Sequence, residues 1–154
     1  MKLYNLDKLV DELNIQKASY NNHDYVYSTL KNYYKYHNVR EIYKLINCNS
    51  LGNKYKKTIL YKNKNYQLAI INWGENVNDL LFDYNKSYIL VLYGSIADYV
   101  YTKDLIPNQY ILLNKGNINF INNDSHIHKL ITKNFNDDKK IINYIFSLHI
   151  EFIK

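Results

Sequence analysis

The sequence predicts a mainly β protein, in which a small helical region precedes a β-barrel. In the first third of the chain, apolar residues recur with helical spacing. From Leu51 onward the texture changes to short runs rich in Ile, Leu, Val and Tyr, which the four glycines punctuate. About eight such runs separated by turns are typical of an antiparallel sandwich or barrel.

Two amphipathic stretches form the expected helical region. Apolar residues from Leu6 to Leu13 recur at i, i+3, i+4 and i+7, which places them on one face of a short helix. Residues from about 24 to 46 repeat the pattern in two stripes, with a joint expected at His37-Asn38. We therefore expect a helical N-terminal cap over residues 1–50 and a barrel over residues 51–154, within one compact domain.

The expected strands are short and closely spaced. Asn63-Lys64-Asn65 and Tyr93-Gly94-Ser95 each predict a tight hairpin between two neighbouring runs. Pro107 is expected in a connection, where its missing N–H does no harm. The runs are residues 57–61, 66–73, 87–93, 95–102, 109–113, 117–121, 126–132 and 141–150.

The charge and aromatic content of the chain bear on whether it binds nucleic acid. The 154 residues carry 20 Lys+Arg against 14 Asp+Glu, a net charge of +6, together with 18 tyrosines. Positive charge with interleaved aromatic rings is one signature of single-strand nucleic-acid binding. Arg40 is the only arginine, however, and nucleic-acid surfaces exploit its bidentate fork. We therefore expect no nucleic-acid partner and read the lysines as a solvated surface.

The same composition bears on location. No apolar run approaches the roughly 20 residues of a membrane span, and the N-terminus has acids but no apolar signal core, so no membrane association is expected. The single Cys48 forms no internal disulfide and is expected to be an inert thiol in a reducing cytosol. Abundant Lys, Asn, Ile and Tyr favour an AT-rich genome, such as that of a large DNA virus or a parasite. A cytoplasmic location is expected, the host cytosol for a viral protein.

In residues 55–60, 66–75, 120–130 and 147–150, taken in this order, the chain resembles cysteine dioxygenase, a cupin that oxidises the thiol of cysteine to a sulfinate with Fe(II) and O2. Residues 55–60 are similar to its Tyr-Thr-Arg-Asn-Leu-Val strand, and residues 66–75 to its strand ending in Trp-Gly-Glu. Residues 120–130 are similar to its Tyr-Ile-Asn-Asp-Ser-Ile-Gly-Leu-His-Arg-Val, and residues 147–150 to its Ser-Leu-His-Leu. The resemblance implies a cupin barrel (double-stranded β-helix, jelly roll) behind a small helical region.

The resemblance also implies an iron site of three histidines, of which this chain keeps one. His128 matches the third ligand, whereas the family's His-x-His pair falls on Phe82 and Tyr84, flanking Asp83. No histidine lies between positions 37 and 126, so two ligands are absent under any alignment. Phe82 and Tyr84 are expected to pack their rings at the barrel mouth. A remaining alternative is a substitute site, in which His126 and His128 join Asp83 in a two-histidine, one-carboxylate triad.

The substrate-binding positions are partly retained. By the resemblance, Tyr55 and Lys57 match the tyrosine and arginine that hold the substrate carboxylate, and lysine keeps the charge without the fork. Ser147 and His149 match two members of a Ser-His-Tyr relay, with Glu151 in place of the tyrosine. An alternative for Ser147 and His149 is a purely structural hydrogen-bonded pair within a strand.

We therefore expect a catalytically degenerate cupin that serves as a binding or interaction module without a cofactor. Its partner is expected to be a small anionic ligand, held by Lys57 and His149 between Tyr55 and Tyr84, or another protein. The alternative is an active iron-dependent thiol dioxygenase, or another metalloenzyme, that binds Fe(II) through His128 and substitute ligands. The oligomeric state is left open by the sequence.

Overall fold

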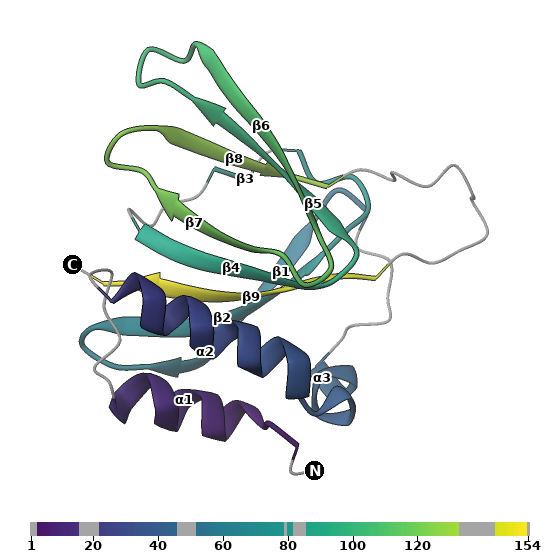
Figure 1. The fold of residues 1–154 in the computed structure, drawn as a ribbon. Helices are drawn as coiled ribbons and strands as arrows, with labels where there is room; N and C mark the ends of the chain where they lie inside the picture. Colours follow the sequence, from purple (N-terminus) through teal and green to yellow (C-terminus); the bar gives the residue numbers. More distant parts are fainter. Residues whose placement is uncertain are drawn as a thin grey trace.

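The computed structural model describes residues 3–15, 22–45, 52–78, 80–81, 86–132 and 144–153, without the side chains of 80–81. Within these ranges three helices come first, and nine strands follow. The strands form two antiparallel sheets, and the helices cover one of them (Figure 1).

The expected helices are present, with the break where the sequence places it. They are α1 (Leu6–Ile15), α2 (His23–Tyr36) and α3 (Val39–Leu45). At the joint, the Asn38 N–H donates to the Tyr4 carbonyl, and the Tyr4 N–H donates to the Tyr36 carbonyl, so the chain ahead of α1 ties down the end of α2. Within the described part of the chain, no helix combines the length and apolar character needed to cross a bilayer.

Each expected run corresponds to an observed strand, and one further strand appears. β3 has only two residues, too few for periodicity to reveal. The run expected over 141–150 is observed from Ile145, and its first three residues lie outside the described part. The strands are β1 (Tyr55–Lys62), β2 (Tyr66–Trp73), β3 (Leu80–Leu81), β4 (Lys86–Tyr93), β5 (Ser95–Tyr101), β6 (Pro107–Asn114), β7 (Ile118–Asn122), β8 (Ile127–Ile131) and β9 (Ile145–Phe152).

The two sheets face each other as the walls of a barrel. The five-stranded sheet has the order β1-β2-β9-β4-β7, and the four-stranded sheet has the order β3-β8-β5-β6. Figure 1 shows the helices on the side of the five-stranded sheet that is turned away from the four-stranded sheet. The five-stranded sheet is therefore a middle layer whose central strands are covered on both faces. This explains why every residue of β2 and β9 is buried, including the polar residues that alternate with apolar ones along β9.

Two apolar clusters fill the two spaces that the middle layer separates. Between helices and sheet, Leu9, Leu13 and Leu30 pack with Phe146 and Leu148, among others. Inside the barrel a second cluster packs the two sheets together, with residues that include Ile71, Trp73, Ile89, Val91, Ile96, Leu113 and Leu130. The smaller second cluster leaves room inside the barrel for polar side chains.

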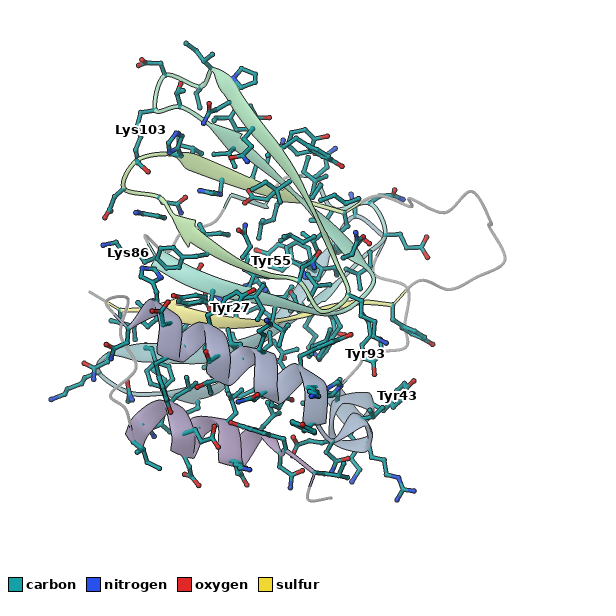
Figure 2. All side chains as sticks on the ribbon, viewed as in Figure 1. Tyr27, Tyr43, Tyr55, Lys86, Tyr93 and Lys103 are labelled. Atoms are coloured by element: carbon teal, nitrogen blue, oxygen red, sulfur yellow. The ribbon has the colours of Figure 1, made fainter. Side chains whose placement is uncertain are left out.

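Several tyrosines are buried between the helices and the five-stranded sheet, in addition to those on the surface. Tyr33, Tyr66 and Tyr88 are among the largest fully buried side chains. Burial raises the pKa of Tyr88 to about 12, so its phenol stays protonated. Tyr43 on α3 lies near Tyr93 on β4, with ring centroids 6.0 Å apart (Figure 2). The aromatic content thus joins helices to sheet.

Two local expectations were wrong. Gly94 makes a tight turn at φ +75°, where a Cβ would lie 2.7 Å from the Tyr144 carbonyl oxygen. The turn does not close a hairpin, however, because β4 and β5 belong to different sheets. Pro107 is the first residue of β6 and lies opposite Tyr101, next to a register shift, which is where a strand tolerates proline. The hairpin at Asn63–Asn65 is confirmed, with Lys62 opposite Gln67.

Candidate functional site

The last strand divides its side chains between the two spaces. Because side chains alternate along a strand, Phe146, Leu148 and Ile150 face the helices. Ser147, His149 and Glu151 consequently face the barrel interior, and all three are fully buried. In the register of β2 and β9, Ile71 lies opposite Ser147, and Gln67 lies opposite Glu151. The three positions matched by the resemblance therefore lie in a row on one wall of the barrel.

A hydrogen-bonded chain links Trp73, Ser147 and His149. The indole Nε1–H of Trp73 donates to Ser147 Oγ at 2.8 Å, and Ser147 Oγ lies 2.6 Å from His149 Nε2. Because an indole can only donate, the Ser147 hydroxyl oxygen accepts this hydrogen bond, and the same oxygen makes the contact with His149. Burial, and secondarily the Lys57 cation, lowers the pKa of His149 to about 3. His149 is therefore neutral at physiological pH and presents no positive charge to a ligand.

Lys57 is paired with a carboxylate of the chain itself. Its Nζ lies 2.7 Å from each carboxylate oxygen of Glu151, a residue 94 positions away. The Gln67 amide also donates to Glu151, at 3.1 Å. Glu151 is the residue that stands where the resemblance places a tyrosine. Tyr55 lies at the rim, 43% exposed, with its ring centroid 6.0 Å from that of Trp73.

A second polar group lies on the other strands of the barrel. The His128 ring on β8 has Nδ1 2.9 and 3.0 Å from the two carboxylate oxygens of Asp98 on β5. Asn119 on β7 donates to the same carboxylate at 3.0 Å, so this contact joins the two sheets. An ionised carboxylate only accepts, and therefore Nδ1 of His128 donates to Asp98.

Sequence reasoning missed Asp98 and Asn119, although Asp98 left a signal. In β5, Ile96, Asp98 and Val100 are spaced by two, so an acid occupies the apolar, inward-facing side of a strand. A buried carboxylate requires a partner, which here is a histidine 30 residues away. Asn119 gave no comparable signal, because asparagine is common throughout this chain.

Of the remaining expected site residues, the structure describes His126. His126 lies in the turn before β8, with Nδ1 3.0 Å from Ser125 Oγ. Phe82, Asp83 and Tyr84 lie outside the described residues, as does Cys48. Over the described ranges, no three His, Cys, Asp or Glu side chains are grouped to hold a metal ion.

Iron chemistry fits this set of residues poorly. The chain has five histidines. His23 contacts Tyr88 and Phe120, His37 contacts the Tyr34 carbonyl, and His149 is bound by Ser147. His128 therefore remains as the histidine that matches a ligand position of the resembled iron site. The described residues thus supply one of three imidazoles.

A separate hollow lies on the helical side of the molecule. It has a volume of about 310 Å³ and is bounded by α1, α3, β1 and β2. Asp7, Glu41 and Lys44 contribute to an otherwise apolar lining, and the Glu41 carboxylate accepts the Leu6 N–H at 2.7 Å. None of the barrel's polar residues lines it, so the hollow and the barrel site are distinct.

Comparison with known proteins identifies the architecture. No protein-family model and no curated protein sequence matches this chain. A cupin superfamily protein from Desulfitobacterium hafniense is similar in structure, with a TM-score of 0.53 at 16% identity over 72% of this chain and 86% of that one. The cupin domain of Schizosaccharomyces pombe Cnp3 has a TM-score of 0.51 at 8% identity over 70% of each chain.

An iron protein is also among the similar structures. A hydroquinone 1,2-dioxygenase in complex with Fe3+ has a TM-score of 0.51 at 11% identity, over 64% of this chain and 28% of that one. At such identities the likeness concerns the fold alone. The helix-covered double sheet described above therefore has the cupin fold.

Proposed function

We propose that this protein is a cysteine-dioxygenase-like cupin that has lost the family's iron chemistry and acts as a binding or interaction module. The sequence supports this proposal through the missing His-x-His pair, which no choice of alignment restores. Ferrous iron held by one imidazole lacks the chelation that makes such sites selective. Related proteins keep a common fold more readily than a common reaction.

The Lys57–Glu151 pair carries the proposal. In the resembled enzymes, a cation at the position of Lys57 receives the carboxylate of the substrate. Here the Glu151 carboxylate lies 2.7 Å from Lys57 Nζ. A ligand anion would have to displace Glu151 and leave a fully buried carboxylate without its cation, which is costly. The chain's own acid therefore competes with any small anionic ligand, and this favours an interaction role over substrate binding.

The alternative function, a metalloenzyme using His128, is favoured by one observation. Asp98 holds Nδ1 of His128 and leaves Nε2 as the donor atom, which is how proteins orient metal-binding histidines. The same arrangement also satisfies a buried Asp–His pair without a metal. Metal analysis distinguishes the two functions.

The experiment is an assay with cysteine, Fe(II) and O2, with cysteine sulfinate quantified by mass spectrometry. A catalytically competent cysteine dioxygenase serves as the positive control. We expect no sulfinate above the protein-free background and substoichiometric iron in the purified chain. Turnover, or stoichiometric iron that His128→Ala removes, overturns the proposal. The His126→Ala variant then tells whether both histidines of the substitute site are ligands.

A second arm tests the internal carboxylate. Glu151→Gln removes the negative charge beside Lys57 while keeping the side-chain shape. Titration calorimetry with cysteine sulfinate should detect binding to this variant and none to the natural chain. Asp104→Asn, an exposed acid in the turn before β6, makes the same change in net charge and should not bind. Equal binding by all three proteins contradicts the role assigned to Glu151.

A further inference from the structure

The hollow on the helical side has walls that the chain itself holds in place. The Glu41 carboxylate of α3 accepts the Leu6 N–H at 2.7 Å, which joins α3 to the start of α1. On β2, the Asn72 amide donates to the Leu45 carbonyl at 3.2 Å, which joins the sheet to the end of α3. Walls fixed in this way enclose about 310 Å³ and need little ordering when a ligand binds. Because ligand pockets begin at about 300 Å³, the hollow suits a small molecule.

The hollow is lined mainly by aliphatic side chains. Leu6 and Val10 come from α1, Leu45 from α3, Leu60 from β1 and Leu68 from β2. Leu68 is fully buried, and the other four are partly buried against the helix-facing cluster. Transfer of a hydrocarbon group from water to such a surface is favourable. No aromatic ring is among these described lining residues, so the surface favours an aliphatic group over one that stacks.

Charges of opposite sign border this aliphatic lining. Asp7 lies in the first turn of α1 and Lys44 in the last turn of α3, and both are exposed. Among the described residues, neither side chain has an ion pair or a side-chain hydrogen bond. An acid at the start of a helix and a base at its end suit the helix dipole, but that preference acts at any helix end. Here the two charges border one hollow, and no ion pair within the described part of the chain neutralises them.

We propose that this hollow binds a small zwitterion with an aliphatic side chain, the chemistry of a free branched-chain amino acid. The ammonium group pairs with Asp7, the carboxylate pairs with Lys44, and the hydrocarbon packs on the aliphatic lining. A fatty carboxylate would meet Lys44 but would also face the like charges of Asp7 and Glu41, whereas an alkylamine would face the like charge of Lys44. A ligand with both charges supplies a counter-charge to each. None of the barrel's polar residues lines this hollow, so the inference goes beyond the proposed function.

Titration calorimetry of the full chain at neutral pH tests the inference with three probes that share one branched carbon skeleton. L-leucine carries both charges, isopentylamine lacks the carboxylate, and isocaproate lacks the ammonium group. We expect saturable binding of L-leucine, and dissociation constants at least about tenfold larger for the two singly charged probes. Raising the ionic strength should weaken the binding of L-leucine, because the side chains of Asp7 and Lys44 are exposed to screening.

Charge variants show which side chain recognises which end of the probe. Asp7→Asn should remove most of the preference for L-leucine over isocaproate, and Lys44→Met should remove most of the preference over isopentylamine. Asp11→Asn on α1 and Lys64→Met in the β1–β2 turn make the same charge changes at exposed positions outside the lining, and both should keep the two preferences. Circular dichroism verifies that all four variants fold.

A steric variant tests the place of binding. Val10→Phe adds a ring to the lining of the hollow and should abolish the binding of L-leucine. The absence of L-leucine binding to the natural chain overturns the inference, and so does equal binding of the three probes. Preferences that survive both Asp7→Asn and Lys44→Met overturn it as well. The sulfinate assay reports on the barrel, so its outcome and that of this titration are separate.

Discussion

The two faces of the five-stranded sheet differ in chemistry although they share the same strands. Toward the helices, β9 presents Phe146, Leu148 and Ile150 to an apolar cluster. Toward the barrel, the same strand presents Ser147, His149 and Glu151. Ser147 accepts from Trp73 and lies within hydrogen-bond distance of His149, and Glu151 accepts from Lys57 and Gln67. Apolar burial on the first face drives folding, because it removes nonpolar surface from water. Polar burial on the second face is tolerated only where partners compensate for desolvation.

The comparison suggests what this molecule has kept. A barrel interior built for stability alone would be apolar, because well-packed hydrophobic residues serve at least as well as a buried ion pair. The Lys57–Glu151 pair and the Trp73-Ser147-His149 chain are thus consistent with an interior derived from a binding site. In the proposed function, the internal contacts replace those once made to a ligand.

The largest expected effect lies on the helix-facing side. Phe146→Ala should lower the free energy of unfolding by about 3–5 kcal/mol, because it leaves a cavity in a fully buried cluster. Urea denaturation measures the change. The control Tyr27→Ala removes a 43% exposed ring on α2 (Figure 2) and should cost no more than about 0.5 kcal/mol. Similar losses for the two variants would contradict the assignment of the stabilising core to this face.

A somewhat smaller effect is expected at the ion pair. Lys57→Met leaves the buried Glu151 carboxylate without its cation and should destabilise the fold by about 3 kcal/mol. The double variant Lys57→Met/Glu151→Met should recover most of that loss, because no charge is left buried. If the double variant is less stable than the single one, the ion pair stabilises the fold by more than each charge compensating the other. The barrel-facing side would then resemble the helix-facing side in its contribution to stability.

An intermediate effect should appear as pH falls. The folded-state pKa of His149 is about 3, against 6.5 for the free side chain, so the unfolded chain takes up this proton first. The contribution of His149 is therefore full above pH 6.5 and is lost between pH 6.5 and 3; the effect is intermediate for a single unit of pH, about 1.4 kcal/mol. His149→Gln should flatten the stability profile in that window.

The smallest effect is expected at the contact between the sheets. Asn119→Ala removes one hydrogen bond to the Asp98 carboxylate, at a cost of about 1–2 kcal/mol in unfolding free energy. Asn108→Ala, at an exposed position near the start of β6, should change stability by less than about 0.5 kcal/mol. A loss of unfolding free energy for Asn119→Ala as large as that for Phe146→Ala would contradict the assignment of the stabilising core to the helix-facing side.

Most of the secondary structure was predictable, because its signals are local. Helical spacing identified α1 to α3, and apolar runs identified every strand except the two-residue β3. Ser147 and His149 could be placed on one strand, since they are two residues apart. The hairpin expected at Gly94 was wrong because a turn signal gives the change of direction and leaves open which sheet the next strand joins.

The site was less predictable, because its contacts cross the barrel. Asp98 and His128 come from neighbouring strands, Asn119 from the facing sheet, and Glu151 lies 94 residues from Lys57. By itself the sequence determined that no His-x-His pair occurs ahead of His126, because an absence of residue types holds in any fold. Only the tertiary structure decided which polar groups compensate one another, because strand register and sheet order select among all the partners that the interior could offer.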